Sequence, residues 1–343
     1  MEATQIGQLI ANAKARKATD VHIISGAPVL YRVGRELLPA TKTKLTPAMT
    51  EQLVFQLINP DQQHLFQQRL DFDLMHGDEN GRYRVNISYN DGAVGAVIRI
   101  LPEEPKSIEE LKLPPVISYL AGLTKGLILI TGATSQGKTT TMSAMINEIN
   151  ATQRKHIVTI EDPIETVHAN KMGIVRQREV GRDTQSFHAG LRAALRQDPD
   201  VIAIGEMRDL ETIRIALTAA ETGVLVMSTL HIISIDKMIE RVLSYAPPEE
   251  ETHLRYMLAG ALQGVVHQEL LPSSRGGKRV AMEVLIATDA AKNIIRGRGA
   301  FFLRNIIATG SRYGMLTMEQ SIKSLLAEEA ISQEIADNVM ANY

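Results

Sequence analysis

Residues 131–141 read TGATSQGKTTT, and the stretch from Gly132 to Thr139 fits the pattern G-x-x-x-x-G-K-[ST]. In such a loop, backbone N–H groups and the start of the following helix face phosphate oxygens. Lys138 would contact the β- and γ-phosphates, and the Thr139 hydroxyl would ligate Mg²⁺. The pattern occurs by chance in roughly one chain in 100 of this length. The predicted nucleotide-binding residues are Gly132, Thr134, Ser135, Gln136, Gly137, Lys138, Thr139 and Thr140.

The alternative is a turn between a strand and a helix that binds no ligand. The surrounding sequence argues against it, because the apolar run GLILIT precedes the loop and the helical stretch KTTTMSAMINEIN follows it. A phosphate loop requires this strand–loop–helix order, since the helix must begin at the phosphate.

Acidic residues follow two further apolar runs. Glu206 ends DVIAIGE, where a carboxylate could orient water or bind Mg²⁺ through water. Glu161, Asp162 and Glu165 lie within five residues in VTIEDPIE, and they repel one another unless a cation or an arginine joins them. A metal–phosphate centre would supply that cation, with Thr139, Glu161 and Asp162 as the predicted metal residues. A solvated turn held by Pro163 explains the three acids equally well.

One histidine and three arginines complete the candidate catalytic residues, together with Glu206 and Glu165. His231 follows the run VLVMSTL and could sense the γ-phosphate, although a structural hydrogen bond is an equally good reading. Arg82, Arg84 and Arg99 lie on two predicted strands, with Arg82 and Arg84 on one face of theirs. An arginine that contacts the γ-phosphate accelerates phosphoryl transfer, but the spacing alone favours a salt-bridged, solvated face.

Short buried strands must position these residues. The runs GLILITG, HIVTIED, DVIAIGE and GVLVMSTLH are apolar on both faces, which is typical of parallel strands covered by helices on both sides. Because ligands of open α/β sheets bind at the carboxyl ends of the strands, we expect these strand ends to converge on one crevice.

The rest of the chain suggests two domains. Residues 1–100 mix helical and strand periodicity, and RYRVNISYN and GAVGAVIRIL predict a hairpin that turns at Asn90-Asp91-Gly92. Residues 101–116 hold four prolines and predict an extended linker with little core of its own. Residues 117–343 would form the nucleotide-binding domain, with a helical C-terminal region from about 265. The predicted fold class is α/β, with a small α+β domain before a P-loop domain.

Composition excludes several classes of protein. The chain has 343 residues, no cysteine and a net charge of −2, so disulfides and thiolate zinc sites are excluded and general nucleic-acid binding is disfavoured. We see no signal peptide and no run of about 18 apolar residues, so we expect a cytoplasmic protein without direct membrane insertion.

In their order, GATSQGKTTT, VTIEDPIE, RQDPDVIAIGEMRDLETIRIALTAAETG and STLH resemble the retraction ATPases of bacterial type IV pili, the PilT family. DVHIISGAPVLYRVG, GRYRVNISYN and RYGMLTMEQSI extend the resemblance over essentially the whole chain. It implies a PAS-like domain followed by a RecA-like ATPase domain. Lys138 and Thr139 then fall in the Walker A motif, Glu161, Asp162 and Glu165 in the Asp box, Glu206 in an atypical Walker B and His231 in the His box. Arg82, Arg84 and Arg99 occupy places from which the family's first domain reaches phosphate.

The resemblance also implies a function and partners. These are Mg-dependent ATP hydrolysis by a homohexamer and pilus disassembly for twitching motility. The implied location is the cytoplasmic face of the inner membrane, with a platform protein and paralogous pilus ATPases as the implied partners.

The sequence departs from the family pattern at several positions. Ala133, Ser135 and Gln136 replace the usual proline, glycine and serine of the loop. Val224 stands where a histidine is usual, Ile232-Ile233 follow His231, and Gly297 replaces a glutamate. These departures leave a scaffold or auxiliary motor with weak hydrolysis as an alternative. An assembly or type II secretion ATPase is disfavoured because the chain has no four-cysteine element and no long N-terminal extension. A ring acting on DNA is disfavoured by the near-neutral charge.

Overall fold

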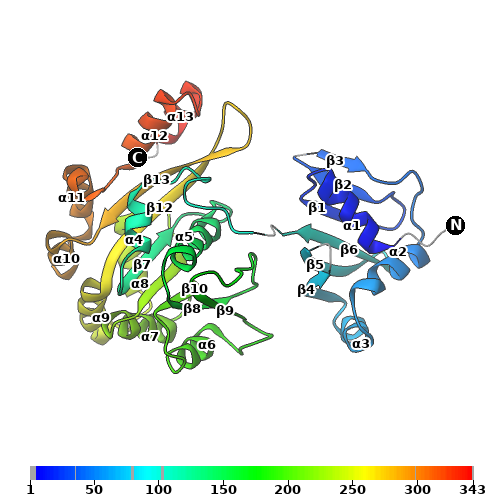
Figure 1. The fold of residues 1–343 in the computed structure, drawn as a ribbon, viewed down its shortest axis with the longest axis horizontal. Coiled ribbons are helices and arrows are strands. Elements are labelled where there is room, and N and C mark those ends of the chain that lie inside the picture. Colours follow the sequence, from blue (N-terminus) through cyan, green and yellow to red (C-terminus); the bar gives the residue numbers. More distant parts are fainter. Residues whose placement is uncertain (1–4, 35, 79–80, 102–103, 298, 342–343) are drawn as a thin grey trace. The chain divides into compact units, whose positions relative to one another are not determined.

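A computed structural model describes residues 5–341 apart from 35, 79–80, 102–103 and 298. The chain forms two compact units, Met1–Glu104 and Pro105–Tyr343 (Figure 1). Both combine helices with one sheet, so the predicted α/β fold class is confirmed. None of the described helices has the length and apolar character that crossing a bilayer requires.

The N-terminal unit contains a six-stranded sheet in the order β3-β2-β1-β6-β5-β4, and all neighbours are antiparallel. Its elements are α1 (Ile6–Ala15), β1 (Asp20–Ile23), β2 (Leu30–Val33), β3 (Glu36–Pro39), α2 (Pro47–Val54), η1 (Phe55–Leu57), α3 (Pro60–Arg69), β4 (Asp71–Asp78), β5 (Gly81–Asn90) and β6 (Ala93–Ile100). The helices share one hydrophobic core with the sheet, where Phe66 of α3 stacks on Tyr89 of β5 at 4.8 Å.

The hairpin predicted around residue 91 is present as β5 and β6. Asp91 and Gly92 both have positive φ, 50° and 74°, as the two-residue turn requires. Strands β3 and β4 were not predicted. Both carry several exposed residues, so neither shows the alternation that marks a half-buried strand as clearly as β5 does.

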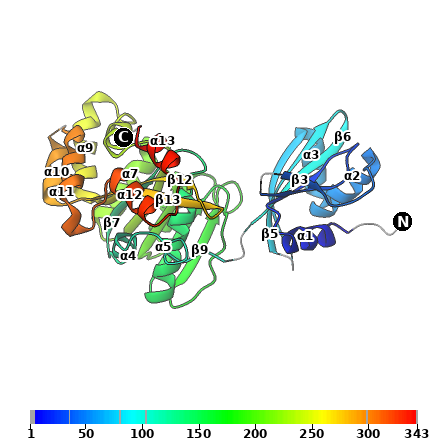
Figure 2. The same ribbon diagram turned by 90° about the horizontal axis from the view of Figure 1, so that it is seen from above.

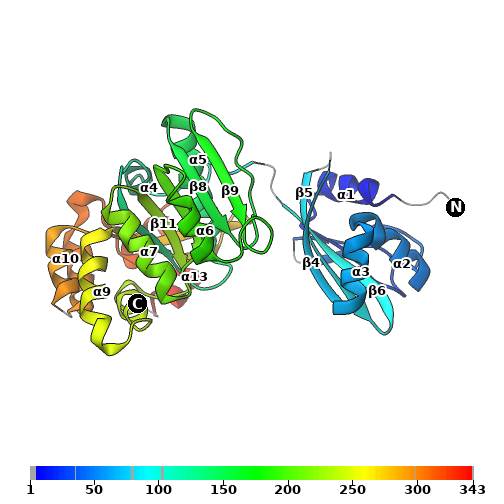
Figure 3. The same ribbon diagram turned by 90° about the horizontal axis from the view of Figure 1, so that it is seen from below.

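The C-terminal unit contains a seven-stranded sheet in the order β13-β12-β7-β11-β10-β8-β9, in which only β13 runs antiparallel to its neighbour. The strands are β7 (Gly126–Thr131), β8 (His156–Glu161), β9 (Ile174–Glu179), β10 (Val201–Glu206), β11 (Leu225–Leu230), β12 (Leu262–Pro272) and β13 (Lys278–Ile286). Five of these strands were predicted, β13 among them from the run AMEVLIA, and β9 and β12 were not. Figure 3 shows β8 and β9 side by side.

Helices cover both faces of this sheet. The helices are α4 (Val116–Ala121), α5 (Lys138–Thr152), α6 (Phe187–Ala194), α7 (Leu210–Glu221), α8 (Ile235–Leu243), α9 (Pro248–Ala261), α10 (Asp289–Arg296), η2 (Ala300–Phe302), α11 (Leu303–Thr309), η3 (Ser311–Tyr313), α12 (Met318–Ala327) and α13 (Gln333–Met340). Along β7, Leu127 and Leu129 pack with α6 to α11, whereas Ile128 and Ile130 pack with α4 and α5. Burying each such side chain contributes about 1.5–3 kcal/mol, which explains why the strands are apolar on both faces.

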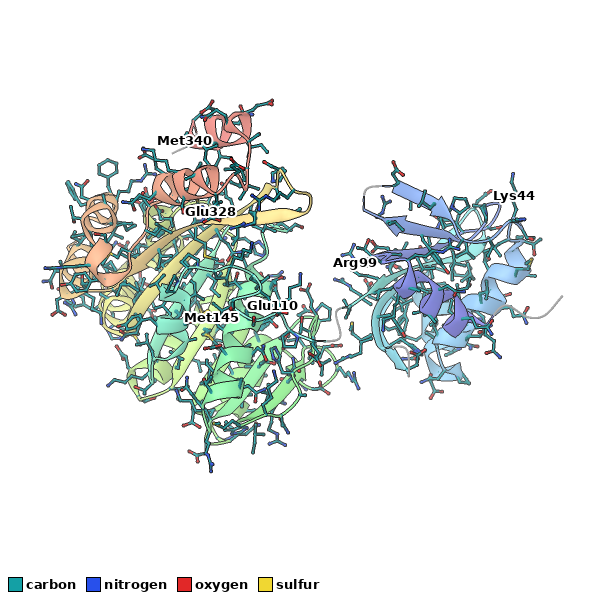
Figure 4. All side chains as sticks on the ribbon, turned by 45° about the horizontal axis from the view of Figure 1, so that its top comes forward. Lys44, Arg99, Glu110, Met145, Glu328 and Met340 are labelled. Atoms are coloured by element: carbon teal, nitrogen blue, oxygen red, sulfur yellow. The ribbon has the colours of Figure 1, made fainter. Side chains whose placement is uncertain are left out.

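The prediction of an extended linker over 101–116 is wrong for the part that begins at Pro105. Ile108, Leu113 and Val116 are buried in the same core as α5. Ser107 and Glu110 each accept a hydrogen bond from the other's backbone N–H, at 3.0 and 2.7 Å, and Glu110 is labelled in Figure 4. The prolines fix φ, but the apolar residues between them still reach the core. Residues 102 and 103 of the predicted linker lie outside the described residues.

The prediction of a helical region from about 265 is also wrong. Residues 262–286 form the β12–β13 hairpin, and helices resume only at Asp289 (Figure 2). β12 lies beside β7 and is buried on both faces, so its sequence lacks the alternation by which an amphipathic strand is recognised. Helices α12 and α13 pack on the hairpin, and Glu328 after α12 accepts a hydrogen bond from Arg279 of β13 at 2.9 Å (Figure 4).

Candidate active site

The parallel sheet brings the predicted residues to one edge. The order β7, β11, β10, β8 places the loop after β7 next to His231 after β11, then Glu206 on β10, then Glu161 on β8. Thr131 at the end of β7 pairs with Leu230, and Glu206 pairs with Thr229. The distance from the loop therefore grows in that order, which differs from the order along the chain.

Lys138 is the buried cation of this edge, with only 6% of its surface exposed. Its Nζ donates to the carbonyl oxygens of Gly132 and Ala133, at 2.9 and 2.7 Å. Burial lowers the pKa of Lys138, and the nearby Glu206 carboxylate opposes that shift. These two carbonyls hold the ammonium over the loop that precedes α5. A bound phosphate would lie at the same place, at the start of the helix.

His231 connects Lys138 with Glu206. Its Nδ1 lies 3.2 Å from Lys138 Nζ, and its Nε2 lies 3.6 Å from a Glu206 oxygen. An ammonium only donates, so Nδ1 must accept and the proton of the neutral ring belongs on Nε2, toward Glu206. Burial and the charge of Lys138 lower the pKa of His231, which favours this neutral form at pH 7. Glu206 and His231, which follow two of the predicted strands, are therefore in one cluster with Lys138.

Arg208 belongs to this cluster and was not predicted. Its guanidinium is hydrogen-bonded to Glu206, which raises the pKa of Arg208. Asp162 also acts electrostatically on Arg208, which links the Asp box to the same edge. The available sequence signal was the spacing Glu206-x-Arg208, because residues two apart in extended chain point the same way.

A cavity of about 390 Å³ opens beside Glu206 and His231. Its lining residues are Glu206, Met207, Arg208, Thr229, Leu230, His231, Ile232, Arg241 and Tyr245. Arg241 lies over the ring of Tyr245 at 4.7 Å. A carboxylate at the wall of such a cavity can hold a water molecule for attack on a phosphate.

The acids of VTIEDPIE do not act as one group. Glu161 is buried and accepts from Thr159 at 2.5 Å and from Gln177 of β9 at 3.0 Å. Burial raises the pKa of Glu161, and like charge from Glu165 and Glu179 adds to this shift. Asp162 and Glu165 are exposed. Glu161 is thus held on the β8–β9 side, where the unpredicted strand β9 supplies its partner.

The described residues contain no group of three His, Cys, Asp or Glu side chains arranged to hold a metal ion. The Thr139 hydroxyl is partly exposed in the first turn of α5, where it could ligate Mg²⁺ bound to phosphate oxygens. Asp162 and Glu161 could then contribute only through water, as Mg²⁺ commonly allows.

The loop carries backbone strain at Ser135. Its φ is 63°, in the left-handed region where an L-residue other than glycine costs about 1–2 kcal/mol. Glycine remains where contact is closest: a Cβ on Gly132 would lie 2.6 Å from the carbonyl oxygen of Gln268. Ser135 therefore occupies a glycine-type conformation without being glycine.

Gln136 ties the strained loop to β12. Its side-chain oxygen accepts from the backbone N–H of Leu270 at 2.6 Å, and its carbonyl accepts from the Gln268 side chain at 2.7 Å. Below the loop, the Thr131 hydroxyl lies 3.1 Å from Nδ1 of buried His267. Burial and the charge of Lys138 lower the pKa of His267 to about 4, so it is neutral at pH 7. A glutamine can span to β12, whereas a serine is too short, so this substitution has a structural role.

The three arginines lie on the sheet of the N-terminal unit. Arg84 and Arg99 are directly opposite each other on β5 and β6, on the face away from the core (Arg99 is labelled in Figure 4). Arg99 donates to Asp20 at 2.9 Å, and Arg84 lies 4.0 Å from Asp73. Arg82 shares the Arg84 face of β5 by alternation, as predicted. Like charges directly opposite repel, so an anion at this face would stabilise the pair.

The strain at Ser135 predicts opposite effects for two substitutions. We expect Ser135→Val to weaken ATP binding by about tenfold, because a β-branched residue tolerates φ near 60° poorly. Ser135→Gly should keep the ATP Kd within about threefold, because glycine adopts this conformation freely. Equilibrium binding of a fluorescent ATP analogue measures both, and a Val variant that binds like the unmodified chain would contradict the assignment.

The tie to β12 predicts that Gln136→Ser raises the ATP Kd by about three- to tenfold. The expected size is that of one lost hydrogen bond, about 1 kcal/mol, since the loop would then be less well organised before binding. Gln333→Ser is the matched control, because Gln333 makes a side-chain hydrogen bond on the exposed helix α13. Equal Kd values for the two variants would show that the tie does not organise the loop.

Known proteins share both the sequence and the fold. Residues 3–342 match the family described as Type II/IV secretion system protein. The chain is 41% identical over 332 residues to the type IV pilus retraction ATPase PilT of Pseudomonas aeruginosa, covering 96% of each. It is 44% identical over 286 residues to a twitching motility protein of Neisseria gonorrhoeae, covering 83% of this chain and 76% of that one. A crystal structure of the pilus retraction motor PilT with bound ADP superposes with a TM-score of 0.90 at 39% identity, covering 97% and 96%. The chain therefore belongs to the type II/IV secretion family and, within it, to the PilT family of pilus retraction ATPases.

Proposed function

We propose that this chain binds Mg-ATP at the loop 132–140 and hydrolyses it to power retraction of a type IV pilus. The observation that carries the proposal is the continuous connection from the loop to the acid: Lys138 contacts His231, and His231 faces Glu206. A bound γ-phosphate would compete with His231 for the Lys138 ammonium. Binding and the position of the acid are thereby linked through a single side chain.

In this mechanism Lys138 and the loop N–H groups neutralise the β- and γ-phosphates. Glu206 orients the attacking water from the cavity wall. The Arg208 guanidinium holds the Glu206 carboxylate in place before the water binds. Thr139 would hold Mg²⁺, which bridges the phosphates and offsets the charge that develops on them. Glu161, Asp162 and Glu165 would orient the water shell of the metal or stabilise the β8–β9 edge.

The assembly we propose is a homohexamer at the cytoplasmic face of the inner membrane. There it would act on a platform protein, and paralogous pilus ATPases are further candidate partners. The relatives from Pseudomonas aeruginosa and Neisseria gonorrhoeae are named for pilus retraction and twitching motility, and this supports the same role here. No nucleic-acid partner is proposed.

A scaffold that binds ATP but hardly hydrolyses it is the second candidate. The strained Ser135 and the Gln136 tie favour it, because a loop fixed to β12 would rearrange less during a cycle. Of the other departures, Ile232 is buried and lines the cavity beside His231, Ile233 is exposed, and Gly297 follows the last residue of helix α10. They leave the Lys138–His231–Glu206 cluster intact.

Two substitutions separate the motor from the scaffold. Lys138→Ala should abolish ATP binding, because it removes the cation that the phosphates require. Glu206→Gln should retain ATP binding and lower kcat by about 100-fold or more, because the amide cannot accept the water proton. Nucleotide binding and steady-state phosphate release measure both. If the unmodified chain and Glu206→Gln released phosphate equally slowly, the motor function would be wrong and the scaffold would stand.

The arginine face supports a further expectation for the same reaction. Arg84→Ala and Arg99→Ala should each lower kcat by one to several powers of ten with a smaller change in ATP Kd, because such arginines stabilise the transition state. Arg69→Ala is the control, since Arg69 is an exposed arginine of α3 in the same unit. Unchanged kcat in both test variants would remove these arginines from the site.

A further inference from the structure

One segment of the C-terminal unit is rich in basic and aromatic residues. Residues 289–313 contain five Lys or Arg and a single acid, Asp289, which gives a formal charge of +4. Since the whole chain has a net charge of −2, the remaining residues carry −6. No further acidic residue occurs before Glu319. The positive charge is therefore concentrated on the helices α10 and α11 and the turns η2 and η3.

Two adjacent phenylalanines protrude from this basic segment. Phe301 and Phe302 of η2 are 72% and 55% exposed, and Phe301 is the most exposed of the large hydrophobic side chains in the described chain. Their rings lie edge to face, with centroids 5.9 Å apart. η2 is anchored beneath them, because Ala300 and Leu303 are buried in the core. The turn thus presents two aromatic rings on a fixed base.

Arginines flank the phenylalanines on both sides along the chain. Arg296 ends α10, and exposed Arg304 lies in the first turn of α11. Among the described residues neither Arg296 nor Arg304 forms a salt bridge within 4.0 Å. Arg304 does act electrostatically on Glu283 and lowers the pKa of that carboxyl, although burial raises this pKa by more. Arg296 donates instead to Asn293 at 2.9 Å. Both guanidinium groups keep donors that can bind phosphate.

We infer that Phe301, Phe302, Arg296 and Arg304, the aromatic–basic patch, dock this chain on an anionic lipid surface. The bilayer interface accommodates both parts of the patch, since the rings enter the boundary of the acyl chains while the arginines bind lipid phosphates. The formal charge of +4 on residues 289–313 favours an anionic partner, and exposed rings flanked by arginines outside any salt bridge within 4.0 Å among the described residues fit the lipid interface. An acidic protein surface is the competing partner.

The inference rests on the proposed function in that it names a contact with the membrane at which the motor would act. It differs from a membrane-spanning segment, because only side chains of a short turn would enter the interface. The departure at Gly297 lies within the same segment, where the family pattern has an acid that would reduce its positive charge.

The test is sedimentation of the full chain with vesicles of phosphatidylcholine alone or with 30% phosphatidylglycerol. We expect binding only to the anionic vesicles, reduced several-fold by raising salt from 0.1 to 0.5 M. Phe301→Ser combined with Phe302→Ser should weaken binding by about tenfold or more. Arg296→Gln combined with Arg304→Gln should weaken it by at least tenfold, since each basic residue near the surface contributes about fivefold.

Tyr119→Ser is the matched control, because Tyr119 is 56% exposed on α4 of the same unit and should leave binding unchanged. Thermal unfolding of each variant shows whether it has folded, and the two double variants perturb different contacts. Equal binding to both vesicle types, or unchanged binding in both double variants, would overturn the inference. Binding only to native membranes, lost after protease treatment of those membranes, would assign the patch to a protein instead.

Phosphate release measured without vesicles separates this inference from the proposed function. Both double variants should hydrolyse ATP within about twofold of the unmodified chain. A chain that hydrolyses ATP but ignores anionic vesicles disproves only the lipid contact. A chain that binds anionic vesicles through the patch without hydrolysing ATP disproves only the motor function.

Discussion

The arrangement of the candidate site depends on which hydrogen-bond acceptors surround the buried ammonium of Lys138. A cation with 6% exposure needs acceptors, and two loop carbonyls and a histidine nitrogen supply them. These partners fix the loop around the Lys138 ammonium, in the form in which we propose that it binds a phosphate. They also require a neutral His231 with its proton toward Glu206. One charge therefore orients the residues of three strand ends.

The unusual loop residues fit this constraint as a pair. Ser135 adopts a conformation that disfavours any side chain, and its neighbour Gln136 adds a hydrogen bond to β12 of about 1 kcal/mol. The strain is of similar size, about 1–2 kcal/mol. The bond to Leu270 can thus offset much of the strain and keep the loop organised. The cost of placing Ser135 at a glycine-type position is thus offset by the hydrogen bond between Gln136 and Leu270, which is 134 residues further along the chain.

The same hairpin joins the loop to the end of the chain. β12 lies beside β7, β13 pairs with β12, and α12 and α13 pack on the hairpin. Arg279 of β13 binds Glu328 in this region. Movement of the loop would therefore displace β12 and, through the β12–β13 hairpin, the helices α12 and α13. The strand β12 carries this connection, and it replaces the helix that the sequence suggested.

Local sequence was sufficient to predict the strand–loop–helix order around Gly132–Thr139, the four strands that precede the candidate residues and the β5–β6 hairpin. Each is specified by neighbouring residues: a glycine pattern, a short run that is apolar on both faces, or a two-residue turn. The order of the strands was decided by the tertiary structure. Along the chain Glu161 comes next after Lys138, yet His231 is its neighbour in space because β11 lies beside β7. The roles of Arg208, Gln177 and Gln268 also required the fold, since they depend on which strand ends meet. The predictions for residues 105–116 and for β12, residues 262–272, were wrong because their apolar residues are buried by distant elements, and no local pattern records such burial.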